Sequence, residues 1–241
     1  VMSFSELYKS SPFGMVSSFF YGTIQSALFT LLAVYATSMN FTILEVSIVT
    51  FLLAVSGAVA QFPVGKISDV YDRRKVIIAS TFGAAIFAII TIFVSGQMYL
   101  PDGLATSKTW FYIFFILFSF CSLPMFSLIL AHTNDYITKD KFVAAGAGLQ
   151  FTFGLGAMSG PFLCSIFMDL VGSNGFFVFL FFFHSLIGAF GIHRMRVRET
   201  VENPDSQFVA MPQTITPAGI ELNPTTEPID EPIKEENTEI N

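Results

Sequence analysis

A short polar segment between two long apolar runs holds charged side chains at spacings that could do work. It reads Gly65-Lys-Ile-Ser-Asp69-Val-Tyr-Asp72-Arg73-Arg74-Lys75. Asp69 and Arg73 are four residues apart, so they can pair on one face of a helical turn. Asp72 can cap the helix that follows and face the positive end of its dipole. The chemistry that this segment predicts is ion pairing at helix ends.

Small residues form a second pattern, deep inside an apolar run. The segment reads Gly154-Leu-Gly156-Ala-Met-Ser-Gly160-Pro161. Gly156 and Gly160 are four apart and would let a neighbouring helix approach closely, while Pro161 interrupts the backbone hydrogen bonds. The pattern fits a packing face or a hinge, and the sequence leaves both open.

A serine and a histidine in the last two apolar runs offer a remote enzymatic alternative. Ser159 and His184 fall at similar depth, as in an intramembrane serine hydrolase. That motif, however, requires glycine where Ala157 stands, and Pro161 follows directly. The sequence contains no metal-ligand cluster, Walker loop or dinucleotide fingerprint. We therefore expect no enzyme activity, no cofactor and no metal, and a neutral His184 bonded to a neighbouring helix.

Long apolar helices must position all of these residues. The chain is 53% hydrophobic and 12% charged, about half the charged fraction of soluble domains. Its charge-free runs are long enough to cross about 30 Å of hydrocarbon as helices. They predict six transmembrane helices, at about 12–38, 45–65, 75–95, 109–131, 142–168 and 175–193. The phenylalanine-rich last helix suits a peripheral, lipid-facing position.

The distribution of basic residues predicts the orientation. If both termini share one side, the opposite side receives Lys108 alone of the Lys and Arg in residues 1–198. The shared side receives Lys9, Lys66, Arg73, Arg74, Lys75, Lys139, Lys141, Arg194, Arg196 and Arg198. We expect a multi-pass protein of the cytoplasmic (inner) membrane with both termini in the cytoplasm.

Charge also divides the chain into segments. We expect a cytoplasmic lead-in at 1–11, a six-helix domain at 12–198 and a disordered acidic tail at 199–241, which is too polar to bury a core. No basic face suited to nucleic acid is present. Because the chain opens on Val1, we expect a fragment of a longer protein.

The segment from Gly65 to Lys75 resembles the cytoplasmic loop signature of the major facilitator superfamily, although Asp72 stands where that family usually has glycine. The resemblance implies that Asp69 contacts helix ends of an opposite half and latches a cytoplasmic gate, with Arg73 as its partner. The Gly156–Pro161 segment is similar to a family element that normally lies in the other half. The implied gate residues are Gly65, Asp69, Asp72, Arg73, Arg74 and Asp135.

Asp135 enters that set through a second resemblance. The segment Ala131-His132-Thr-Asn134-Asp135, together with the tail, is similar to the YcaD-like branch of bacterial facilitators. Asp135 would lie on the same membrane face as Arg73 and join its charges. A solvated loop aspartate is the equal alternative.

The resemblance implies an all-α membrane fold, the C-terminal half of a twelve-helix transporter built as two inverted three-helix repeats. The first and fourth helices would line a solute cavity, with candidates Tyr21, Gln25, Thr30, Tyr35, Ser119 and Ser122. The implied function is secondary active transport of a small solute by alternating access. The implied partners are the lipid bilayer and a missing N-terminal half or a second copy. A non-transporting membrane scaffold remains the alternative.

Overall fold

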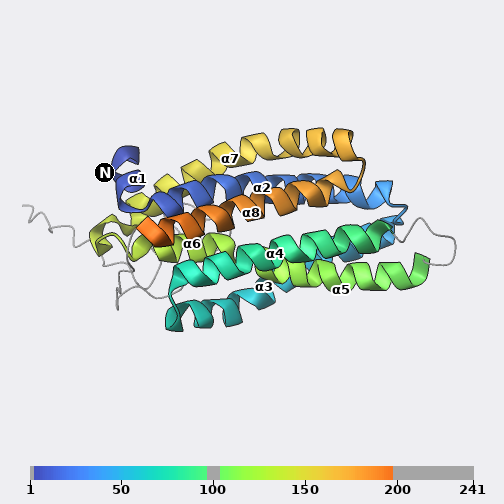
Figure 1. Cartoon of the computed structure of the whole chain (residues 1–241), viewed down its shortest axis with the longest axis horizontal. Coiled ribbons are helices and arrows are strands. Elements are labelled where there is room, and N and C mark those ends of the chain that lie inside the picture. The colour runs from blue at the N-terminus through green and yellow to red at the C-terminus, as the bar shows by residue number, and fades with distance from the viewer. Residues whose placement is uncertain (1–2, 97–103, 198–241) are drawn as a thin grey trace, which may run out of the picture.

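The computed structural model describes residues 3–96 and 104–197, and in these ranges the chain is helical without strands. Six helices are long and apolar enough to cross a membrane, and Figure 1 shows them as an elongated bundle. The elements are α1 (Phe4–Ser10), α2 (Pro12–Ser38), α3 (Ile43–Val70), α4 (Arg73–Gly96), α5 (Leu104–Ser122), α6 (Met125–Asn134), the 3-10 helix η2 (Lys139–Lys141), α7 (Phe142–Val171) and α8 (Gly175–Val197). The six predicted spans are confirmed, most with ends a few residues longer than expected. The tail 199–241 lies outside the described residues.

Local capping explains where two of the helices begin. Ser11 caps α2 by accepting a hydrogen bond from the Gly14 amide, and Pro12 is the first helical residue, as the sequence predicts. Thr42 and Glu45 form a capping box at the start of α3. The Glu45 carboxylate also pairs with Lys108 of α5 at 2.7 Å.

The helices pack as two sets of three with matching neighbours. The second helix of one set lies along the first helix of the other: α7 packs on α2, and α3 packs on α5. The third helices, α4 and α8, pack on each other. One set is α2, α3 and α4, and the other is the fourth span (α5 with α6), α7 and α8. If the two sets are exchanged, the pairings stay the same. Because each set has three spans, the two sets run in opposite directions across the membrane. This arrangement is the predicted pair of inverted repeats. Figure 1 shows α7 and α3 on opposite sides of the bundle.

The predicted fourth span is broken into two helices. A turn at Leu123-Pro124 separates α5 from α6, because Pro124 has no amide hydrogen with which to continue the backbone ladder. The Tyr21 hydroxyl of α2 donates to the Leu123 carbonyl at 3.1 Å, so a side chain satisfies a carbonyl at the break.

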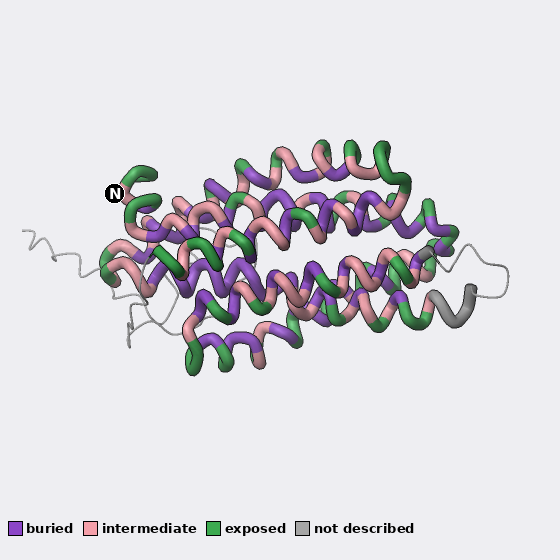
Figure 2. Tube along the Cα trace, viewed as in Figure 1, coloured by how far each residue is buried: buried purple, intermediate pink, exposed green. Residues whose placement is uncertain are grey.

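The lipid-facing position predicted for the last helix is wrong. The phenylalanines Phe176, Phe177 and Phe179 of α8 are fully buried. Phe176 and Phe177 pack against Tyr35, and Phe177 also meets Phe111 of α5 edge to face. Phe179 packs against Phe167 of α7. The least buried spans are instead α3 and α7, whose outward faces carry the most exposed apolar residues (Figure 2).

Candidate functional site

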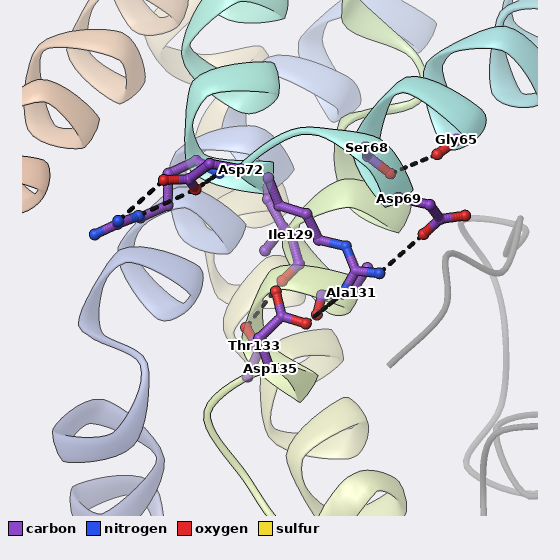
Figure 3. A network of polar contacts seen from close by, with 10 residues as sticks. Gly65, Ser68, Asp69, Asp72, Ile129, Ala131, Thr133 and Asp135 are labelled. Atoms are coloured by element: carbon purple, nitrogen blue, oxygen red, sulfur yellow. Dashed lines mark hydrogen bonds and ion pairs between the residues drawn. The ribbon is translucent and has the colours of Figure 1, made fainter. Parts of the chain in front are cut away.

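The ends of α3, α4 and α6 meet at a set of charged side chains. Arg73, the first residue of α4, donates through Nη2 to Asp69 Oδ1 of α3 at 2.9 Å. Its Nη1 donates to the Asp135 carboxylate after α6 and to the Ala131 carbonyl at 3.2 Å. Figure 3 shows the two carboxylates on either side of the guanidinium group. We call Asp69, Arg73 and Asp135 the Arg73 junction.

Burial differs among the members of the Arg73 junction. The side chains of Arg73 and Asp135 are 6% and 13% exposed, whereas that of Asp69 is 39% exposed. A buried guanidinium needs carboxylate partners, because an unpaired buried charge is costly. Arg73 and Asp135 therefore hold this bundle together, while Asp69 remains open to contact from outside it.

Asp72 and Arg74 form a separate pair beside the Arg73 junction. Asp72 Oδ1 accepts from the Arg74 amide at 2.9 Å, which caps α4 as the sequence predicts. Asp72 Oδ2 also accepts from Arg74 Nη2 at 3.0 Å. The carbonyl of Gly65, the remaining residue predicted for the gate, accepts from Ser68 Oγ at 2.7 Å within α3. These contacts are local to the loop and the two helices it joins.

An ion pair also holds α1, the short helix before α2, against the bundle. Glu6 of α1 pairs with Lys141 at 2.7 Å, before the start of α7. The hydrogen bond from Lys141 and its positive charge lower the pKa of Glu6 below the ordinary value. Leu7 is buried against Gly148 of α7, so α1 belongs to the packed bundle.

Gly156 and Gly160 lie where α2 and α7 touch backbone to backbone. A Cβ atom on Gly156 would lie 1.9 Å from the Phe19 carbonyl oxygen, and one on Gly160 would lie 2.2 Å from that of Thr23. The Thr23 hydroxyl donates to the Gly156 carbonyl at 3.1 Å across this contact. Helix α7 continues through Pro161 to Val171. These contacts favour the packing alternative over the hinge.

The six candidate cavity residues do not share one environment. Gln25 is buried at 4% exposure, and Thr30 is exposed on α2. Tyr35 lies inside the aromatic cluster, stacked on Phe176 with ring centroids 5.2 Å apart. The Ser119 hydroxyl donates to the Phe115 carbonyl within α5 at 2.7 Å. Of these four, only Thr30 is exposed.

The other two candidates belong to contacts at the break in the fourth span. Tyr21 bonds the Leu123 carbonyl, as described above. Ser122 Oγ lies 2.9 Å from His184 Nε2. His184 Nδ1 lies 2.7 Å from the Leu180 carbonyl, which can only accept, so Nδ1 carries the proton and Nε2 accepts from Ser122. The expected bond from His184 to a neighbouring helix is present.

The serine and histidine of the enzymatic alternative have different partners. Ser159 Oγ donates to the Gly156 carbonyl at 2.8 Å, while His184 bonds Ser122 and Leu180. No hydrogen bond joins Ser159 to His184 in the described ranges, so they do not form a dyad there. The same ranges contain no group of three or more His, Cys, Asp or Glu side chains placed to hold a metal ion.

Sequence reasoning missed the break at Leu123-Pro124 and the Ser122–His184 pair that lies beside it. Pro124 inside a charge-free run was the available signal for the break. The pair had no sequence signal, because its two residues are 62 positions apart.

Comparison with known proteins identifies the family. The sequence pattern of the Major Facilitator Superfamily matches residues 14–225. The chain is 27% identical over 186 residues to the uncharacterized MFS-type transporter YfkF of Bacillus subtilis, covering 74% of this chain and 44% of the relative. It is 24% identical over 172 residues to an uncharacterized MFS-type transporter of Yersinia enterocolitica, covering 71% of this chain and 41% of the relative. No solved structure matches the chain.

The chain thus spans less than half the length of these curated relatives. Its assignment to a particular branch of the superfamily stays a prediction. With six helices able to cross a membrane and a match that covers most of its length, the chain is a multi-pass membrane protein that belongs to the Major Facilitator Superfamily.

Proposed function

We propose that this chain is the C-terminal half of a secondary active transporter that moves a small solute across the bacterial cytoplasmic membrane by alternating access. The observation that carries the proposal is the Arg73 junction at one end of a six-helix bundle of this family. Membership of the family supports transport. The junction supports a gate at that end, because a carboxylate held at a helix end can contact another bundle in one conformation and lose that contact in the other.

Asp69 is the member of the junction suited to reach an opposite half. Its side chain is 39% exposed, whereas Arg73, which donates a hydrogen bond to it, is buried. A helix end of the other half could contact Asp69 when the cytoplasmic side is closed and release it when that side opens. Arg73 and Asp135 would position Asp69 in both conformations. Gly65, Asp72 and Arg74 would shape the turn that carries it.

The partner in this proposal is a second six-helix bundle, supplied by an N-terminal half or by a second copy of the chain. Alternating access needs two bundles that rock around a central site. The curated relatives are more than twice as long as the matched region, which supports a covalent N-terminal half. Thr30, exposed on α2, would face the cavity between the two bundles.

Residues 1–241 expressed alone are expected to aggregate or self-associate and to show no solute flux. One bundle provides half of the proposed machine, and polar groups such as Thr30 would meet hydrocarbon at a free-energy cost. The test compares this chain with the same chain carrying its native upstream region, by monodispersity in detergent and by flux in proteoliposomes. Flux from the 241-residue chain alone would mean that a second copy of the chain, and not an N-terminal half, provides the other bundle. A monodisperse long form that moves no solute would favour the non-transporting scaffold.

The proposed orientation makes a second prediction. Single cysteines at positions 139 and 196 should react with a membrane-impermeant thiol reagent only from the cytoplasmic side, and a cysteine at 102 only from outside. The reason is the concentration of basic residues near 139 and 196. A cysteine at 196 that reacts from outside whole cells would reverse the orientation and move the Arg73 junction to the external gate.

A further inference from the structure

A small cavity lies at the Arg73 end of the bundle, where five helices converge. It is lined by the end of α1, the start of α2, the start of α4, the end of α6 and the end of α8. Its polar lining comes chiefly from Arg74, Arg194, His132 and Tyr136. None of the functions proposed above uses His132, Tyr136 or Arg194. The cavity is therefore a separate feature of this end of the molecule.

The charge of this cavity comes from one side chain. Asp72 neutralises Arg74 through the pair described above. Arg194 has no carboxylate partner in the described ranges. Helices α2 and α4 begin at the cavity, whereas α1, α6 and α8 end there, so the helix dipoles largely oppose one another and add no positive charge. Among the side chains, Arg194 supplies the positive charge that remains, which suits an anion with a single negative charge.

The size of the cavity limits what can enter it. Its volume is about 20 Å³, room for about one water-sized group. A whole phosphate ion or a transported solute would not fit, but one oxygen of a larger anion would. The buried ring of Phe13 borders the same space, with His132 packed edge-on against it.

The position of the cavity points to the kind of anion. Arg74 is the second residue of α4, and Arg194 is the fourth residue from the end of α8. Both therefore lie at the level where the spans leave the hydrocarbon, which is the level of lipid headgroups. Basic pockets between transmembrane helices at this depth suit phosphate-bearing headgroups.

We propose that Arg194 and Arg74, with His132 and Tyr136, bind the phosphodiester of an anionic phospholipid. One phosphate oxygen enters the cavity, Arg194 balances the negative charge, and the acyl chains stay in the surrounding leaflet. The inference does not depend on transport, because it concerns only side chains of this bundle and the lipid around it. Arg196 provides a matched control, since it is exposed, lies two residues further along α8 and does not line the cavity.

The test measures lipid retained by the protein at its full native length. Native mass spectrometry compares phosphatidylglycerol with phosphatidylcholine for the wild type, Arg194→Gln and Arg196→Gln. Arg194→Gln is expected to lower the affinity for phosphatidylglycerol at least tenfold, whereas Arg196→Gln changes it less than twofold. The wild type is expected to prefer phosphatidylglycerol over phosphatidylcholine.

Three results would overturn the proposal. Equal losses in the two arginine variants would reduce the effect to general surface charge. Equal retention of the two lipids would remove the anionic headgroup as the ligand. Displacement of phosphatidylglycerol by millimolar inorganic phosphate, with equal protection against heat, would assign the cavity to free phosphate and remove the lipid. Melting temperature, recorded for each variant, separates loss of lipid from loss of fold.

Discussion

Alanine at Gly156 is expected to destabilise the bundle, whereas alanine at Gly154, two residues earlier in the same helix, is expected to leave it unchanged or slightly more stable. The new methyl group at Gly156 would lie 1.9 Å from the Phe19 carbonyl oxygen and 2.8 Å from its carbon. Nothing lies within 4 Å of the corresponding position at Gly154. Overpacking of this kind costs about 1–3 kcal/mol, and a backbone obstacle places Gly156 at the upper end.

The measurement is thermal unfolding in detergent of the protein at its full native length. Separation of α2 from α7 would also weaken two hydrogen bonds that cross their contact. One joins the Thr23 hydroxyl to the Gly156 carbonyl at 3.1 Å, and the other joins the Ser18 hydroxyl to the Leu149 carbonyl at 2.8 Å. Equal melting temperatures for the Gly154 and Gly156 variants would contradict the close contact and return the segment to the hinge alternative.

The sequence predicted the features that depend on long runs of apolar residues and on short spacings between charged residues. Each span can be recognised in the sequence by a run of at least 20 uncharged residues, because charged side chains are costly in hydrocarbon over that length. The cap formed by Asp72 follows from helix geometry alone. Asp69 and Arg73 do pair at their four-residue spacing, but across the end of α3 and the start of α4, with the extended Tyr71 between them, and not on one helical turn as the sequence predicted. The addition of Asp135 was reached by resemblance, and the structure brings its side chain to Arg73.

Features that depend on neighbours distant in sequence could not be predicted. The phenylalanines of α8 look the same to a hydropathy scale whether they face lipid or aromatic rings on α5, since both surroundings are apolar. The family resemblance places Ser122 and Tyr35 in a cavity because they are polar groups on the first and fourth spans. The structure instead directs Ser122 to His184 and packs the Tyr35 ring among phenylalanines, which only the packed helices reveal.

Asp69→Asn is expected to shift the distribution between inward-facing and outward-facing conformations about tenfold, with little change in melting temperature. The proposed gate depends on a contact that Asp69 makes in one conformation, and losing about 1.4 kcal/mol of it gives a factor of ten. The side chain is 39% exposed, so its contribution to the stability of this bundle is small. The measurement is the rate at which a cysteine at position 30 reacts with an impermeant reagent from the cytoplasmic side.

Asp135→Asn is expected to lower the stability more and to shift the conformational distribution less than Asp69→Asn does. Its side chain is 13% exposed and bonds the buried Arg73, so removing the charge is expected to cost about 1.5–3 kcal/mol of stability. The expected change in labelling at position 30 is smaller than for Asp69→Asn, because Asp135 faces this bundle and not its partner.

Lys75→Gln is the matched control for both aspartate variants. Lys75 belongs to the same basic cluster, is exposed and lies outside the Arg73 junction, so its loss removes one charge from the loop without touching the junction. Labelling and melting temperature are both expected to stay at wild-type values. If Lys75→Gln shifts the labelling as far as Asp69→Asn does but in the opposite direction, the loop acts through its total charge, and the gate assigned to Asp69 fails. If only Asp69→Asn shifts it, loop charge cannot explain the effect, because the two variants change the net charge by one in opposite directions.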